Sequence, residues 1–162
     1  MNAIQLLKHQ HQEMGRLFKD IERCSDDEVL EIRRLFAELA DILAAHSEIE
    51  EQLFYPAVKQ RQTEDMLKEF VQEHFEVKQI LAQMLDLEAG SSEFILLLAQ
   101  LKDVVLSHMK EEESDMFPKV QQLFEREDLV TLGEEMEHRF GEIIAGEPRF
   151  EVRGELDAPA QI

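Results

Sequence analysis

The sequence predicts an all-α protein: an antiparallel up-down-up-down four-helix bundle built from two repeated helical hairpins, plus a short C-terminal helix and tail. Apolar residues recur with the roughly 3.6-residue period of a helix, whereas alternating strand-like runs are missing and threonine occurs only twice. The second observation is an internal repeat, in which the pattern of residues 46–56 returns at residues 108–118. Upstream of these stretches, His11 and His74 occupy matching places. We therefore expect two similar hairpins that close into one bundle.

The first hairpin is predicted from two helix-start signals. An asparagine followed three residues later by a glutamine predicts a helix over residues 2–23. The sequence Ser-Asp-Asp-Glu at 25–28 resembles a capping box and predicts a second helix that runs to about residue 60. Pro56 falls late in this helix, where it is expected to kink or end it.

The second hairpin repeats this organisation. Thr63 is expected to begin a third helix, which stops near the Glu-Ala-Gly sequence at 88–90. Ser91 is expected to begin a fourth helix, which reaches about Phe124. Pro118 falls late in that helix, so the same kink or end is expected there.

The C-terminal region lies outside the repeat. Residues 128–145 carry an apolar stripe and predict a short fifth helix, while the glycine- and proline-containing residues 146–162 predict an extended or poorly ordered tail. We therefore divide the chain into a bundle of residues 1–124 and an appendage of residues 125–162. The fifth helix is expected to pack on the outside of the bundle or to form a partner interface.

Four histidines occupy core-facing heptad positions, one on each long helix. These residues are His11, His46, His74 and His108. Glu50 and Glu112 each follow a histidine by four residues and therefore share its helix face. His9 and His138 lie off the apolar stripes and are expected at the surface. One core histidine is usually an ordinary buried side chain, but four with two carboxylates would be very costly without a neutralising cation.

The donor types restrict the metal and the way it is held. Imidazole and carboxylate ligands suit iron, manganese or zinc better than calcium or magnesium. Two repeated halves imply two metal ions related by an approximate twofold axis. The expected ligands are His11 and His46 for one ion, His74 and His108 for the other, and Glu50 and Glu112 as bridges. The neighbouring acidic residues, among them Glu48, Glu51, Glu111 and Glu113, are interpreted as a solvated face.

Charge and composition exclude several classes of protein. The net charge of −19 argues against binding to nucleic acid and to anionic membrane surfaces. No apolar run approaches the roughly 18 to 20 residues of a membrane span, and the first twelve residues lack the apolar core of a signal peptide. The single Cys24 excludes a disulfide framework. A reducing, cytoplasmic location is therefore expected, and the oligomeric state is not indicated.

Taken in order, these motifs resemble the hemerythrin family, including its bacterial hemerythrin-like (HHE cation-binding) branch. The resemblance covers residues 4–122 and rests on His11, on the two His-x-x-x-Glu motifs, on Glu73-His74, and on the sequences Phe54-Tyr55-Pro56 and Phe117-Pro118. It implies two non-haem iron ions bridged by both glutamates and by an oxo or hydroxo group. Zinc and manganese are the alternative metals.

Two residues depart from the pattern of that family. Relatives that carry dioxygen reversibly have a further histidine at the place of Lys78, and many relatives have an aspartate at the place of Gln10. Without the further histidine, each metal would keep an open or water-filled position, which favours reactivity over carriage. Tyr55 is the only tyrosine, and its phenolate could fill such a position. On an ideal helix it lies about 180° from His46 and about 140° from Glu50, which favours a packing or supporting role.

The leading hypothesis is a di-iron protein that binds or reduces small oxidants, namely hydrogen peroxide, dioxygen or nitric oxide. Peroxide decomposition or oxygen chemistry is favoured, which leaves open a catalase-like or other oxidoreductase activity. The alternative is a non-enzymatic protein that binds, stores or senses oxygen or iron. Iron–sulfur repair, known from relatives with an added cysteine-containing domain, is a third class.

Overall fold

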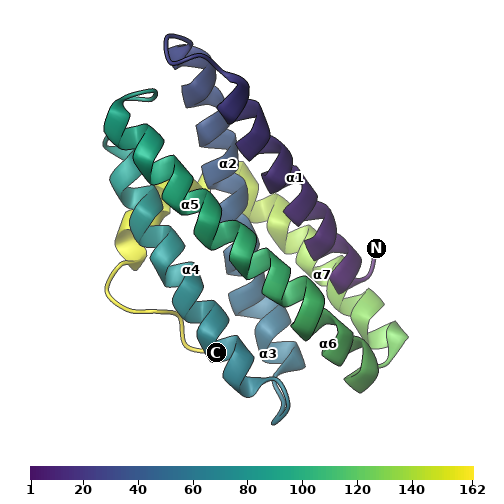
Figure 1. The fold of residues 1–162 in the computed structure, drawn as a ribbon. Helices are drawn as coiled ribbons and strands as arrows, with labels where there is room; N and C mark the ends of the chain where they lie inside the picture. The colour runs from purple at the N-terminus through teal and green to yellow at the C-terminus, as the bar shows by residue number, and fades with distance from the viewer.

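The computed structural model describes residues 1–162 and contains helices but no strands (Figure 1). The four long helices are α1 (Ala3–Arg23), α2 (Val29–Ile49), α4 (Glu64–Leu85) and α5 (Ser92–Glu111). The first two pack along each other, as do the last two, and the directions alternate through the bundle. The predicted all-α class and helical bundle are confirmed.

The two predicted capping boxes of the first hairpin have different outcomes. The Asn2 side chain accepts a hydrogen bond from the backbone N–H of Gln5 (2.9 Å), and the Gln5 side chain accepts one from the backbone N–H of Asn2 (3.0 Å). Ser25 instead donates both its backbone N–H and its hydroxyl to the Glu28 carboxylate. Its hydroxyl therefore caps no helix, and α2 begins at Val29 rather than at residue 25.

The second hairpin begins and turns close to the predicted residues. Thr63 precedes α4, and the Ser91 side chain accepts a hydrogen bond from the backbone N–H of Phe94 (3.2 Å) at the start of α5. Gly90, between the two helices, has a φ of 84°. A Cβ atom there would lie 2.9 Å from the carbonyl oxygen of Asp26, so glycine also permits the close approach of the two hairpin loops.

Both proline-containing segments continue as helix past the proline and end at Val58 and Leu123, close to the predicted residues 60 and 124. A π-helical turn follows each His-x-x-x-Glu motif, and a short α-helix follows each turn. These elements are η1 (Glu50–Phe54) with α3 (Tyr55–Val58), and η2 (Glu112–Met116) with α6 (Phe117–Leu123). Pro56 and Pro118 occupy the first turn of α3 and α6. Proline crowds the carbonyl group four residues earlier, and the wider π-turn relieves that conflict.

The apolar core is divided into two clusters along the bundle axis. One cluster includes Phe18, Leu39 and Leu81, and the other includes Ile4 and Phe70. On α1 and α4, His11 and His74 lie between residues of the two clusters. On α2 and α5, His46 and His108 lie near the helix end, where the residues of one cluster give way to those of the other. Apolar packing therefore encloses the histidine level from both ends.

The fifth helix, α7 (Arg126–Ala145), packs against α1 and α2 on the outside of the bundle, as expected. Leu129 and Met136 are buried in the same apolar cluster as the N-terminal half of α1. At Gly133, a Cβ atom would lie 2.5 Å from the carbonyl oxygen of Met1, so only glycine allows this close crossing. The division into residues 1–124 and 125–162 stays a prediction.

The prediction of an extended tail is wrong for residues 148–155, which form the 3-10 helix η3 (Pro148–Glu155) against α2 and α4. Val152 is buried in the bundle, and Arg149 donates to the Asp41 carboxylate (2.6 Å). The rest of the chain, yellow in Figure 1, runs along α4. The proline and glycine residues of this segment favour irregular structure, but its contacts with the bundle stabilise a helix. Separately, none of the helices combines the length and apolar character that a membrane span requires.

Candidate metal centre

The six predicted ligand side chains meet inside the bundle. Both carboxylate side chains are fully buried, and the histidines are 3% to 6% exposed. Helices α1, α2, α4 and α5 supply His11, His46, His74 and His108, while Glu50 and Glu112 are the first residues of η1 and η2. By contrast, His9 and His138 lie at the surface.

Glu50 spans histidines of both predicted pairs. Its Oε1 lies 3.1 Å from Nε2 of His46, and its Oε2 lies 3.0 Å from Nε2 of His74. The two carboxylate oxygens therefore face two separate imidazoles. This arrangement suits a carboxylate that bridges two metal ions with one oxygen on each.

Glu112 occupies the corresponding place in the second half of the chain. Its Oε1 lies 3.0 Å from Nε2 of His108 and 3.4 Å from Nε2 of His11. The ligand-type atoms accordingly form two groups, within each of which all atoms lie within 4.8 Å of one another. The first group is His11, His46, Glu50 and Glu112, and the second is Glu50, His74 and His108.

Several of these buried atoms have no hydrogen-bond partner. They are both ring nitrogens of His11, Nε2 of His46, Oε1 of Glu50, Oε1 of Glu112 and Nδ1 of His108. His46 and Glu50 approach each other closely, yet their atoms are not aligned as donor and acceptor. Buried polar atoms are normally satisfied, and the inward-facing unpaired atoms of His11, His46, Glu50 and Glu112 converge as the ligands of a cation would. Imidazole nitrogen and carboxylate oxygen fit iron, manganese or zinc.

Each imidazole also has a polar side chain near its outer nitrogen, Nδ1, although only His46 and His74 are hydrogen-bonded there. These side chains are Gln10 for His46 (2.7 Å), Glu51 for His74 (2.9 Å), Glu73 for His108 (3.5 Å) and Glu113 for His11 (3.8 Å). A hydrogen-bond acceptor at Nδ1 favours the tautomer whose Nε2 is free for a metal. Gln10, which stands where many relatives have an aspartate, therefore supports His46 through its amide oxygen.

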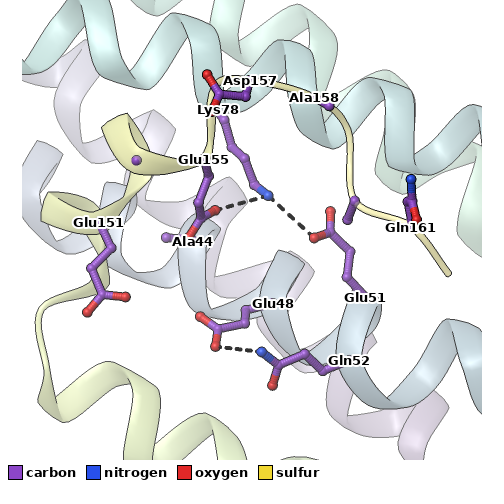
Figure 2. A pocket seen from close by; sticks show the side chains of 12 residues that line it. Ala44, Glu48, Glu51, Gln52, Lys78, Glu151, Glu155, Asp157, Ala158 and Gln161 are labelled. Carbon is purple, nitrogen blue, oxygen red and sulfur yellow. Dashed lines mark hydrogen bonds and ion pairs between the residues drawn. The ribbon is translucent and has the colours of Figure 1, made fainter.

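The prediction that Glu51 belongs to a solvated acidic face is wrong. Its side chain is only 9% exposed and contacts both His74 and Lys78. The Lys78 ammonium lies 3.4 Å from Glu51 and 3.1 Å from Glu155. Figure 2 shows Lys78 between these carboxylates at a cavity of about 510 Å³. Lys78 therefore faces the cavity and the C-terminal segment.

Tyr55 lies inside the centre, contrary to the angle expected on an ideal helix. Its hydroxyl lies 3.0 Å from Oε2 of Glu50, 2.9 Å from Oε2 of Glu112 and 3.3 Å from Nε2 of His74. The π-turn explains the difference, because a wider turn brings the fifth residue after Glu50 back onto its face. The sequence carries no comparable signal for the extra residue in this turn.

The electrostatics of the metal-free centre follow from burial and close charges. Burial would raise the pKa of Glu50, but His46 and His74 lower that pKa well below its usual range. Burial and the two nearby carboxylates raise the pKa of the Tyr55 phenol well above its ordinary value. The glutamate is therefore ionised at neutral pH, and the phenol retains the proton that it donates to the carboxylates.

Comparison with known proteins adds independent evidence. The family model of the hemerythrin HHE cation-binding domain matches residues 2–120. A solved structure of an HHE cation-binding domain-containing protein from Mycobacterium kansasii is 27% identical. It superposes with a TM-score of 0.80 over 96% of this chain and 94% of that one. A relative from Nostoc sp., described as a DNA nickase, is 30% identical over 117 residues. The matched region covers 72% of this chain but only 33% of the relative's length.

Proposed function

Because the chain belongs to the hemerythrin HHE cation-binding family, we propose that this metal-binding domain holds two iron ions and reacts with small oxidants. One observation carries the proposal: Glu50 and Glu112 each approach a histidine of both pairs within 3.4 Å. Glu50 directs a different oxygen at each pair and can therefore bridge two ions that the imidazoles hold separately. Glu112 meets both pairs with Oε1 alone and would bridge through that one oxygen.

The surroundings of the centre suit chemistry with small molecules. Two adjacent irons would supply two one-electron changes of oxidation state at one place, which suits dioxygen, nitric oxide or the O–O bond of peroxide. The apolar clusters exclude bulk water, and the Tyr55 hydroxyl hydrogen-bonds to both bridging carboxylates. Lys78 is held by Glu51 and Glu155 and supplies no additional imidazole.

Hydrogen peroxide is the favoured substrate because its decomposition needs no external partner. One peroxide molecule takes up two electrons and two protons to give two water molecules. A second releases two electrons and two protons to give dioxygen. Binding of nucleic acid is not proposed, since a net charge of −19 opposes contact with phosphates.

The test combines metal analysis with an assay of peroxide consumption. The iron-loaded protein is expected to contain two irons per chain and to consume peroxide. His74→Ala should lower the metal content and the peroxide consumption strongly, whereas the surface controls His9→Ala and His138→Ala should change neither. Equal metal loss in all three variants would contradict the ligand assignment. A persistent oxygenated spectrum that reverses under vacuum, with peroxide untouched, would favour the oxygen-binding alternative.

A further inference from the structure

The side chains next to Nδ1 of the four imidazoles occupy matching positions in the two repeats. At one of these positions an amide in the first repeat replaces a carboxylate in the second. Gln10 directly precedes His11 and contacts His46, just as Glu73 directly precedes His74 and contacts His108. The first contact is to a neutral amide, 97% buried, and the second is to a carboxylate. The same place in the two halves therefore carries different charges.

The other pair of outer partners differs in distance and exposure. Glu51 lies 2.9 Å from Nδ1 of His74, and its side chain is 9% exposed. Its repeat counterpart, Glu113, lies 3.8 Å from Nδ1 of His11, and its side chain is 41% exposed. Solvent screens the second interaction far more than the first. Lys78 contacts the other oxygen of Glu51, which leaves Oε1 directed at His74.

These differences act in the same direction on one half of the centre. His74 has a hydrogen-bonded carboxylate on Nδ1, and His108 has a carboxylate 3.5 Å from its Nδ1. A negative charge beside the outer nitrogen increases the basicity of a ligating imidazole. His46 has an amide, which can hold the ring and its tautomer but adds no negative charge. His11 has a distant, solvated carboxylate. The imidazoles of the first half are consequently the weaker donors.

Resting on the proposed two-metal function, we propose that the two metal positions are unequal in affinity. His74 and His108 hold the first ion tightly, whereas His11 and His46 hold the second more weakly. Gln10 acts as the positioning residue that sets this difference. Since loss of an outer partner typically lowers metal affinity about 10- to 100-fold, the two positions should differ by a factor of that order.

Competition with a chelator tests the proposal, with cobalt(II) as the probe because its visible absorption reports coordination. The wild-type protein should bind two ions and release them in two phases. His11→Ala should remove the weaker phase, and His74→Ala should remove the tighter phase. These assignments identify which half loses its ion first.

The decisive variant is Gln10→Glu, which should raise the weaker affinity about 10- to 100-fold and merge the phases. Gln12→Glu adds the same charge at an exposed position of α1 and should leave both phases unchanged. Glu73→Gln is the reciprocal change and should weaken the tighter phase. It keeps the proposal testable if Gln10→Glu does not fold.

Two ions released with equal affinity from the wild-type protein would overturn the inequality and leave the proposed function standing. Identical behaviour of Gln10→Glu and Gln12→Glu would overturn the role of Gln10. Loading of fewer than two ions would contradict the proposed function itself, and with it this inference.

Discussion

At the residue scale, the pKa values of the buried histidines shift in different directions when no metal is bound. Burial lowers the pKa of His108, but Glu112 raises it well above the ordinary value, and the pKa of His74 is also raised. The pKa of His46 is instead lowered, because burial is the largest influence on it. The pKa of Glu50 lies well below its usual range. Protonated His108 next to ionised carboxylates therefore replaces part of the charge of a cation.

These shifts predict a pH dependence that differs between the two forms. In the metal-free protein, protonated His108 contributes stability below its unfolded pKa of about 6.5, and this contribution is lost as pH rises through the folded-state pKa. Ionised Glu50 contributes above about pH 4.3, and its contribution is lost as pH falls through its lower folded-state pKa. Metal binding requires neutral imidazoles and therefore strengthens as pH rises.

Thermal unfolding of both forms from pH 5 to 8 measures this difference. The metal-free protein should lose stability above about pH 6.5, while the metal-loaded protein should not. The gap between their melting temperatures should therefore widen toward pH 8. A gap that stays constant over this range would show that His108 does not titrate against the carboxylates.

At the element scale, the π-turns η1 and η2 accommodate the prolines at the start of α3 and α6. Deletion of the exposed Gln52 should convert η1 into an α-turn, because it removes the one residue that the wider turn accommodates. Pro56 would then crowd the carbonyl group four residues earlier, at a cost of about 3 kcal/mol. Pro56→Ala should have little effect alone but should restore most of that loss in the deletion background.

Urea unfolding of the wild-type protein, the two single variants and the combined variant completes the cycle, since non-additivity isolates the coupling between the two sites. Additive effects would mean that the π-turn does not relieve the proline. Because Tyr55 would follow Glu50 by four residues after the deletion, it should still face the centre.

Most elements could be predicted because their signals are local. Asn2 with Gln5 marks the start of α1, and the repeated His-x-x-x-Glu spacing places each glutamate beside its histidine. The π-turn could not be predicted, because its extra residue is read only from the backbone hydrogen bonds that close on Glu50. The direction of Tyr55 toward Glu50 differs from the ideal-helix angle for the same reason. Glu51 is less exposed than its acidic neighbourhood predicts because His74 and Lys78 contact it.

At the scale of the whole molecule, the C-terminal region contributes to the packing of the bundle. Truncation after Gly146 should remove the burial of Val152 and cost about 1.5–3 kcal/mol. Truncation after Glu127 should cost several times more, because it also removes the buried residues of α7. The second truncation also uncovers the apolar side of α1, so chains should associate.

Chemical unfolding and sedimentation of the two truncated proteins test this difference. Both are expected to retain metal, since no predicted ligand lies beyond Glu112. Equal stability of the two proteins would mean that α7 does not contribute to the core. Loss of metal from either would mean that the C-terminal region helps to close the centre.

The position of Tyr55 gives this protein a built-in optical reporter. The chain contains one tyrosine and no tryptophan, so excitation at wavelengths that phenylalanine does not absorb gives intrinsic fluorescence from one phenol. That phenol is fully buried and hydrogen-bonded to the carboxylates between the two histidine pairs. An open-shell ion such as iron or cobalt should quench the emission, whereas closed-shell zinc should leave it largely intact. Emission intensity can therefore follow loading, release and metal exchange in real time without an attached dye.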